Sequence, residues 1–261
     1  SYEGVEALEN YRDQESIESY RSEALAVFAP MSEFIISLSH KPKFSIVEVG
    51  SGNSALLYNF ENKSVLESGV GIEISKSRHA FAEKWREDMS FLNTLNFNGD
   101  FLDAELNTNT FDFFVCNGTF HIIGAISDSY PLALINKAYS TLRSGGMIVL
   151  DIPTHKKKIG QFENGAYTFE VKLPDTNPFD MARYHMTNLS RKSVYQINSS
   201  YFDASGLCVR KKSDEFYSYS ENEVTGLLKS AGFVDVVTYS GINKEPYEEG
   251  VFDTMLVVAR K

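Results

Sequence analysis

Short apolar runs alternate with helical patterns along the middle of the chain. Five runs have the length and composition of buried β-strands: 44–50, 68–75, 95–102, 111–118 and 146–153. The segments between them that repeat apolar residues at helical spacing are 54–64, 76–89 and 130–145. The connections are short, as in the βα units of a parallel sheet. The pattern predicts an α/β fold built on a doubly wound, mostly parallel sheet.

The N-terminal region has only the helical period. Apolar residues recur at helical spacing between residues 15 and 40: Ile17, Tyr20, Leu25, Phe28, Met31 and Phe34. Pro30 lies inside this pattern, and a proline removes a backbone donor and clashes with the preceding turn. We therefore expect two helices that are separated at Pro30.

The pattern changes after Pro153. The segments 166–173 and 193–219 alternate apolar and polar residues, which is typical of antiparallel strands with one solvated face. Asp203-Ala-Ser-Gly206 has the composition of a hairpin turn. We expect an antiparallel segment inserted into the α/β pattern.

The C-terminal part returns to the α/β pattern. Ser220 and Glu223 have the spacing of a capping box at the start of a helix, and Gly232 has the residue type that ends one. The runs 234–241 and 254–261 predict two final strands.

Composition narrows the class of protein. Hydrophobic residues make up 43% of the 261 residues, as in globular proteins, and no apolar run reaches the ~18 residues of a membrane span. The N-terminus is polar and acidic, unlike a secretory signal. Cys116 and Cys208 are the cysteines, and we expect free thiols and a cytoplasmic location. The net charge of −10 argues against general binding to nucleic acid.

The charge is unevenly distributed. Between His155 and Lys212 ten Lys or Arg residues face five Asp or Glu residues, whereas the rest of the chain is strongly acidic. This basic stretch coincides with the predicted antiparallel insertion. A solvated face is the ordinary explanation of such a run, and an anion-binding surface is the alternative.

The turn after the first strand carries the first chemical signal. Gly50-x-Gly52-x-x-Ala55 matches the pattern of loops that bind dinucleotides. Glu48, just before the turn, discriminates between ligands because it would repel a pyrophosphate by about 1–4 kcal/mol. The same carboxylate would attract the ammonium and sulfonium groups of S-adenosylmethionine (SAM). The glycines therefore predict a nucleoside-type ligand, and Glu48 favours SAM.

Five ordered segments resemble the class I SAM-dependent methyltransferases: VEVGSGNS, GVGIEIS, NGDFL, FDFFVCNGTFHII and LRSGGMIVLDIP. The resemblance implies a seven-stranded sheet with an antiparallel last strand. It also implies one domain over 1–261, with a helical lid at 1–42, a cofactor-binding core at 43–153 and 219–261, and a substrate-recognition insertion at 154–218.

The resemblance assigns cofactor-binding roles by position. Gly50, Ser51 and Gly52 would line the methionine half of SAM, with Glu48 beside it. Glu73, followed by Ile74, would accept hydrogen bonds from the ribose hydroxyls. Asp100 and Phe101 would hold the adenine, and Asn117 and Gly118 would lie beneath the cofactor. In the lid, Tyr20 would cover SAM and Arg21 would bind its carboxylate, or the arginine is a surface residue of an amphipathic helix.

The acceptor side is less specific. His121 follows the fourth strand, where a histidine near its ordinary pKa would be the general base. The alternatives are a residue that orients the substrate, a core histidine, or catalysis by positioning alone. Five further residues are candidates for binding the acceptor: His155, Arg183, His185, Arg191 and Tyr195.

These patterns and the resemblance predict methyl transfer from SAM to a small anionic metabolite. The resemblance to bacterial methyltransferases with such a lid and insertion implies a nucleotide-linked sugar or a phosphorylated precursor of a surface glycan or natural product as the acceptor. Oxygen is preferred over nitrogen as the methylated atom because His121 offers a base. No compact acidic cluster suggests a metal. A homo-oligomer is compatible with the sequence. The rival functions are a nicotinamide-dependent oxidoreductase and a SAM-binding protein without activity.

Overall fold

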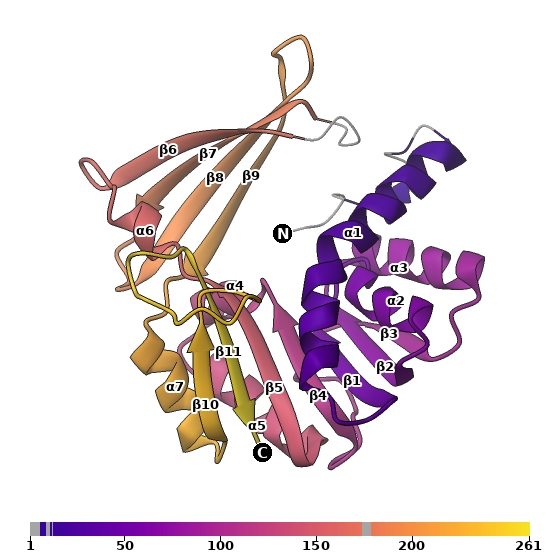
Figure 1. The fold of residues 1–261 in the computed structure, drawn as a ribbon. Coiled ribbons are helices and arrows are strands. Elements are labelled where there is room, and N and C mark those ends of the chain that lie inside the picture. The colour runs from indigo at the N-terminus through magenta and orange to yellow at the C-terminus, as the bar shows by residue number, and fades with distance from the viewer. Residues whose placement is uncertain (1–5, 9–10, 12, 174–178) are drawn as a thin grey trace.

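The core of the fold is a seven-stranded sheet with the order β10-β11-β5-β4-β1-β2-β3 (Figure 1). The computed structural model describes residues 6–8, 11, 13–173 and 179–261. Strand β11 is antiparallel to both of its neighbours, and the pairs among β1 to β5 are parallel. The strands are β1 (Phe44–Val49), β2 (Leu66–Glu73), β3 (Thr94–Asn98), β4 (Phe111–Asn117), β5 (Leu142–Pro153), β10 (Val234–Tyr239) and β11 (Thr254–Arg260). The predicted α/β class and the antiparallel last strand are confirmed.

Helices cover both faces of this sheet because the side chains of its buried strands are apolar on both sides. One face packs against α1 (Gln14–Leu38) and α2 (Ala55–Asn62), and α3 (Lys76–Met89) packs beside them. The other face packs against α4 (Phe120–Ile126), α5 (Tyr130–Thr141) and α7 (Glu221–Ser230). The helix expected over 130–145 ends at Thr141, and α4 was not predicted.

The expected break at Pro30 is wrong, because α1 runs through this residue as one helix. The two halves of α1 are fixed by separate apolar contacts. Ala24 packs with α2 and α3, whereas Phe34 and Ile35 pack against the sheet. Pro30 itself is exposed. Tertiary packing on both sides of the proline offsets the ~3 kcal/mol that an interior proline costs.

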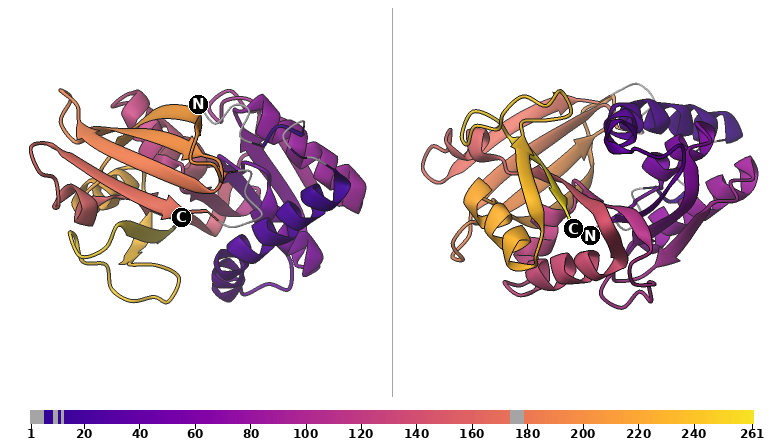
Figure 2. Two further views of the ribbon diagram at one scale, coloured as in Figure 1. Left: turned by 90° about the horizontal axis from the view of Figure 1, so that it is seen from above. Right: turned by 60° about the horizontal axis from the view of Figure 1, so that its bottom comes forward.

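The insertion forms a separate four-stranded antiparallel sheet, with the order β6-β7-β8-β9. Its strands are β6 (Ala166–Lys172), β7 (Met181–Asn188), β8 (Val194–Phe202) and β9 (Cys208–Tyr217). A short helix, α6 (Lys156–Ile159), precedes it. This sheet and α1 stand on either side of the carboxyl ends of the core strands (Figures 1 and 2).

The predicted hairpin turn joins β8 to β9. Gly206 has a φ of +80°, a conformation that favours glycine. The Asp203 carboxylate accepts hydrogen bonds from the backbone N–H groups of Ser205 and Leu207, both at 3.0 Å. Strand β7 was not predicted separately. It completes the insertion as a sheet between β6 and β8.

The capping box of α7 provides a test of local stability. Ser220 Oγ accepts a hydrogen bond from Glu223 N at 3.3 Å, and Ser220 N donates to Glu223 Oε2 at 2.7 Å. Ser220→Ala should therefore lower the free energy of unfolding by about 1 kcal/mol. Urea denaturation measures this loss. Thr225→Ala, in the same helix beyond the cap, is the control and should cost nothing measurable. Equal stabilities of the two variants would contradict the capping role.

Candidate functional site

A cavity of about 340 Å³ opens at the carboxyl ends of β1, β2 and β4. Open α/β sheets bind ligands at this edge. Among its lining residues are ten of the twelve predicted for the cofactor: Glu48, Gly50, Ser51, Gly52, Glu73, Ile74, Asp100, Phe101, Asn117 and Gly118. The structure thus brings residues from four separate segments to one site. Tyr20 and Arg21 do not line it.

The glycine turn is shaped by the protein's own side chains as well as by backbone conformation. Gly50 and Gly52 have φ values of +70° and +57°. A Cβ at Gly50 would lie 2.2 Å from Thr119 Oγ1, and one at Gly52 would lie 2.8 Å from Arg78 Nη2. These glycines therefore make room for Thr119 and Arg78. Space for these two side chains is therefore a reason for glycine at both positions, in addition to the close approach of a ligand.

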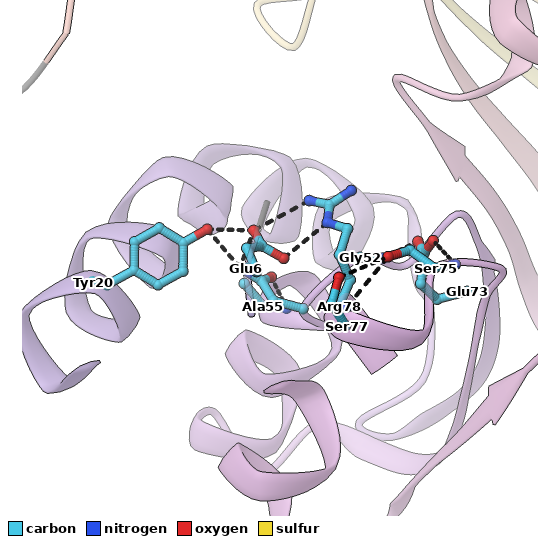
Figure 3. Close-up of polar contacts among 9 residues, drawn as sticks. Glu6, Tyr20, Gly52, Ala55, Glu73, Ser75, Ser77 and Arg78 are labelled. Carbon is cyan, nitrogen blue, oxygen red and sulfur yellow. Dashed lines mark hydrogen bonds and ion pairs between the residues drawn. The ribbon is translucent and has the colours of Figure 1, made fainter. Parts of the chain in front are cut away.

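Glu73 connects the turn to α3. Its carboxylate accepts hydrogen bonds from Gly52 N at 2.9 Å and from Ser75 N at 2.8 Å (Figure 3). Each carboxylate oxygen has a further lone pair, so the group can also accept hydrogen bonds from two ribose hydroxyls. Glu73 is 6% exposed and lies in the cavity wall. Its position fits the expected ribose contact.

Glu48 lies at the base of the cavity. It is 2% exposed, and its Oε2 has no hydrogen-bond partner among the residues that the structure describes. Burial and the nearby charge of Glu73 raise the pKa of Glu48 well above its ordinary value, against the opposing charge of Arg78. A buried acid without a partner is costly, and a ligand cation would relieve that cost. The carboxylates of Glu48 and Glu73 in the cavity wall therefore fit the cationic groups and the ribose of SAM.

Arg78 is a residue of this site that the sequence reasoning missed. Its guanidinium donates to the Glu6 carboxylate, with Nε to Oε2 at 2.8 Å and Nη2 to Oε1 at 3.2 Å (Figure 3). The Tyr20 hydroxyl donates to the same carboxylate. Asn53, which lines the cavity, donates to the Tyr20 hydroxyl at 3.4 Å. Tyr20 thus lies behind the cavity wall. The sequence did hold a signal for Arg78, since this residue lies in the first turn of the helix that follows Glu73.

Arg21 is not part of the cavity. Its Nη2 lies 2.9 Å from Asp88 Oδ2, and its guanidinium packs over the rings of Phe81 and Trp85. The sequence prediction that Arg21 binds the SAM carboxylate does not fit this position. Tyr20 and Arg21 are consecutive in a helix and so point about 100° apart. They serve different parts of the α1–α3 packing.

The opposite end of the cavity is fixed around Asp100. Its carboxylate accepts a hydrogen bond from Leu102 N at 2.8 Å and one from the Tyr130 hydroxyl. Phe101 is buried beneath, and Gly118 has a φ of +62° in the turn after β4. Tyr130, from α5, also lines the cavity. The arrangement has the apolar surface and the acceptor that an adenine requires.

His121 faces away from the cofactor cavity. Ile122, Ile123 and Ile126 of α4 line the cavity instead, together with Thr119, the residue that precedes the helix. The ring of His121 lies 5.9 Å from that of His155 and 6.2 Å from that of Phe216. Burial, together with the charge of His155, lowers the pKa of His121 to about 3. The prediction that His121 has a pKa near the ordinary value is therefore wrong. Its imidazole is neutral and a weak base.

The pleat of the insertion sorts the candidate substrate residues into two faces. We define the inner face by Met186, Tyr195, Ser199, Lys212 and Phe216, which share one side of β7, β8 and β9 by register. Phe216 packs against His155 at 4.7 Å between ring centroids and against Tyr195 at 5.5 Å. The inner face is therefore the one turned to the core.

Arg183 and His185 lie on the outer face, one register position away. Arg183 Nε donates to Glu170 at 2.6 Å, and His185 Nδ1 lies 2.8 Å from Thr168 Oγ1. Both pairs are exposed. Because side chains alternate across a sheet, Arg183 and His185 point away from the face that meets the core, and their acceptor-binding roles stay predictions. Of the predicted acceptor residues, His155 and Tyr195 lie where the insertion meets the core.

Arg191 holds the insertion to the core. Its Nη1 donates to Ala125 O at 2.8 Å, its Nη2 donates to Gly124 O at 3.1 Å, and it forms an ion pair with Asp128. These carbonyls belong to the last turn of α4. Arg191 therefore caps α4 from the β7–β8 connection. Its predicted contact with the acceptor stays a prediction.

The described residues offer neither a cluster of metal ligands nor a helix fit to span a membrane. No group of three or more His, Cys, Asp or Glu side chains within them is arranged to hold a metal ion. None of the helices formed by the same residues has the length and apolar character of a membrane span.

Comparison with known proteins agrees with the geometry. Residues 47–150 match the family model described as a methyltransferase domain. No curated protein matches the chain. Among solved structures, a SAM-dependent methyltransferase from Clostridium acetobutylicum ATCC 824 is 16% identical, with a TM-score of 0.70, covering 89% of this chain and 91% of that one.

Two further solved structures are similar to the chain over most of its length. CcbJ from Streptomyces caelestis is 14% identical, with a TM-score of 0.70, covering 89% of this chain and 88% of that one. SAM-bound CalS10 from Micromonospora echinaspora, an amino pentose methyltransferase, is 17% identical, with a TM-score of 0.66, covering 96% of this chain and 98% of that one.

The chain has the α/β fold of the class I SAM-dependent methyltransferases, and its cavity has the shape and charge to fit a nucleoside-type ligand with a cationic end. Within that fold, residues 47–150 match a methyltransferase domain. When bound, SAM supplies the electrophilic methyl group. The residues that would hold it are Glu48, Glu73 and Asp100, with the backbone of the turn from Gly50 to Gly52.

Glu73→Ala should weaken SAM binding severely. The substitution removes the acceptor for Gly52 N and Ser75 N as well as the ribose contact, at a cost of ~2–4 kcal/mol or about 30- to 1000-fold in Kd. Isothermal titration calorimetry measures the effect. Glu67→Ala, near the other end of β2, is the control and should bind SAM normally. Near-normal affinity in a folded Glu73→Ala protein would remove this carboxylate from the site.

SAM binding should release up to one proton from Glu48. The free protein binds this proton more tightly than the unfolded chain does, because the folded pKa lies above the ordinary 4.5. The contribution of Glu48 to the free energy of unfolding therefore falls as the pH rises through the pKa that this group has in the folded protein. A bound cation favours the ionised form and expels the proton. Calorimetry at neutral pH in buffers of different ionisation enthalpy measures this release.

Glu48→Gln provides the control for proton release. It keeps the shape of the side chain and should show the same binding enthalpy in every buffer after correction. A wild-type enthalpy without buffer dependence would show that Glu48 does not exchange a proton with solvent on binding.

Proposed function

We propose that the protein transfers a methyl group from SAM to an oxygen atom of a small metabolite that carries an anionic group. A nucleotide-linked sugar or a phosphorylated precursor of a surface glycan or natural product has this chemistry. The observation that supports the proposal is the position of the insertion, whose inner face meets the core beside the cofactor cavity.

The cationic side chains relevant to the acceptor lie on the inner face. Arg210 and Lys212 share that face of β9 with Phe216, because they are separated by even numbers of residues. Burial lowers the pKa of Lys212, and the charges of Arg78 and Arg210 lower it further, against the effect of Asp214. Lys212 is thus within electrostatic reach of Arg78, which lines the cofactor cavity. Lys212 is ion-paired with Asp214 at 2.5 Å on this face, and Arg210 adds a second positive charge there. The excess of positive charge would attract and orient an anionic acceptor.

His121 and His155 fit an orienting role better than base catalysis. The pKa of His155 is lowered to about 4 by burial and by the charge of Lys158, so both imidazoles are neutral at pH 7. Each Nδ1 is buried and has no hydrogen-bond partner among the described residues. A polar group of the acceptor that entered between the insertion and α4 would supply one. Tyr195 adds an aromatic ring beside them.

The names of two structural neighbours support a sugar-like acceptor. CalS10 is described as an amino pentose methyltransferase and KedS8, 18% identical with a TM-score of 0.62, as a sugar N-methyltransferase. Likeness at this level carries the fold and only suggests the substrate. Nitrogen is accordingly the rival methylated atom. The nicotinamide-dependent rival is tested directly by comparing the thermal shifts caused by SAM and by NAD.

An acceptor screen tests the proposal. Nucleotide-linked sugars, sugar phosphates, neutral glycosides and amino sugars are each incubated with enzyme and SAM, and release of S-adenosylhomocysteine is measured. Turnover confined to compounds with a phosphate or carboxylate supports the proposal, and mass spectrometry with NMR identifies the methylated atom. Turnover of neutral compounds alone would overturn the anionic part. Absence of turnover throughout a broad panel, with normal SAM binding, would favour the non-catalytic rival.

Lys212→Met should raise the KM for an anionic acceptor at least tenfold, because a charge-assisted contact is worth about 1.5–3 kcal/mol. Steady-state kinetics measure the change, and normal SAM affinity verifies the fold. Lys211→Met changes the same residue type at the next position of β9, on the outer face, and should leave KM unaltered. Arg183→Ala should also be silent. Equal KM values for the two lysine variants would remove the inner face from anion recognition.

A further inference from the structure

A second cavity adjoins the cofactor cavity on the side of α1. Its volume is about 390 Å³. Its walls are Val27, Phe28, Pro30 and Met31 of α1, Asn117 and Gly118 after β4, Asp151 of β5, and Ile242 of the β10–β11 connection. Phe28, Asn117 and Gly118 also line the cofactor cavity. The two cavities therefore meet at the end of β4, beneath the expected position of the cofactor.

Asp151 is the charged residue of this wall. Met147 and Val149 on β5 pack into the cluster on the α1 side, and Asp151 follows Val149 by two residues. Its side chain therefore lies on the same face of the sheet. In β4, Asn117 pairs with Asp151 by register. Within residues 6–8, 11, 13–173 and 179–261, no hydrogen bond or ion pair reaches the Asp151 carboxylate.

The surroundings of Asp151 make it suited to proton transfer. Burial raises the pKa of Asp151 to about 6. None of the other lining residues is titratable. The neighbouring titratable group is the thiol of Cys116 in β4, whose pKa is raised by burial and by the charges of Glu48 and Asp151. A carboxylate of this basicity is ionised at neutral pH and can still accept a proton from a reacting hydroxyl.

We propose that this second cavity receives the reacting end of the acceptor and that Asp151 binds its hydroxyl and acts as the general base. The inference rests on the methyl transfer proposed above. The hydroxyl proton passes to the Asp151 carboxylate while the hydroxyl oxygen forms a bond to the methyl carbon. The carbon–sulfur bond breaks and sulfur keeps its electron pair, which gives a methyl ether and S-adenosylhomocysteine. Asp151 then returns the proton to solvent.

The walls define the chemistry of the reacting end. Val27, Phe28, Met31 and Ile242 supply apolar surface around one carboxylate. A second anion at this place would be repelled by Asp151, at low dielectric and without a compensating cation. The group that enters is therefore an uncharged ring with a hydroxyl, such as a sugar ring. Any phosphate of the acceptor stays outside this cavity, toward the inner face of the insertion.

Asp151 lines a cavity, whereas His121 lines neither of the two. The α4 residues that line the cofactor cavity include Ile122 and Ile126, but not His121. His121 contacts the insertion on another side of the helix. The two residues therefore make separate contributions, and their variants should differ in pH dependence.

Asp151→Asn tests the base with the best acceptor from the screen. Wild-type kcat should fall below pH about 6 as Asp151 becomes protonated. Asp151→Asn should lower kcat by roughly 10²- to 10⁴-fold and abolish that acidic limb, with SAM affinity unchanged. His121→Asn should keep the limb. A carboxyl ¹³C resonance that titrates near 6 in the free wild-type protein and is lost in Asp151→Asn gives a readout independent of turnover.

A pair of helix variants tests the cavity itself. Val27 is 66% exposed, so Val27→Trp can fill the cavity from the surface of α1 without disturbing the core. It should raise the acceptor KM at least tenfold and leave the Kd of SAM unchanged. Ala26→Trp is the control, since Ala26 is exposed but does not line the cavity. Equal KM values for the two variants would exclude this cavity as the acceptor site.

The outcomes separate this inference from the proposed function. Turnover by wild type with an undiminished kcat and an intact acidic limb in Asp151→Asn would overturn the role of Asp151 while methyl transfer stands. Methylation confined to amino groups, with an unchanged pH profile in the variant, would also overturn it. Absence of turnover by wild type with every acceptor would overturn the proposed function and with it the inference.

Discussion

The Glu73 carboxylate holds the cofactor site together. By accepting hydrogen bonds from the backbone of Gly52 and Ser75, it fixes the turn after β1 against the start of α3. Arg78, one turn into α3, can then lie over Gly52 and reach Glu6 from the N-terminal region. The side chains of Glu73, Arg78 and Glu6 thus connect the N-terminal region, the glycine turn and β2. Neutralising Glu73 would disturb all three.

Three adjacent strands, β1, β4 and β5, each carry a polar residue near the carboxyl end. Asn117 on β4 pairs with Asp151 on β5, and Glu48 on β1 pairs with Val115, two residues before Asn117. All three polar residues face the α1 side of an otherwise apolar surface. Glu48 lines the cofactor cavity, Asp151 lines the second cavity, and Asn117 lines both. In the function proposed above, these two acids would serve different ligands although they lie on one sheet face. The helix α1 completes both cavities through Phe28.

The residues of the cofactor cavity could be predicted because local sequence determines them. A strand followed by a glycine turn, and acids at strand ends, specify which edge of a parallel sheet carries the ligand. The insertion could not be resolved in the same way. A period of two shows that neighbouring residues such as Lys211 and Lys212 lie on opposite faces but does not show which face meets the core. Asp151 did leave a signal, since it is a single acid in the apolar run 147–152.

Other errors arose from tertiary packing. Pro30 has the local chemistry of a helix break, and only the contacts of Phe34 and Ala24 with separate parts of the core keep α1 continuous. Arg21 was assigned by its neighbour Tyr20, although consecutive residues of a helix point in different directions. Neither outcome follows from sequence pattern without knowledge of what the helix packs against.

The cap that Arg191 places on α4 has a consequence for how such enzymes diversify. The carbonyls of Gly124 and Ala125 depend on a guanidinium from a segment far along the chain, and α4 in turn shapes the cofactor cavity through Ile122 and Ile126. Residues 154–218 are therefore not an interchangeable module. A chimera that received another insertion would lose this cap. Its cofactor site would change together with its choice of acceptor, unless the new segment carried an equivalent donor.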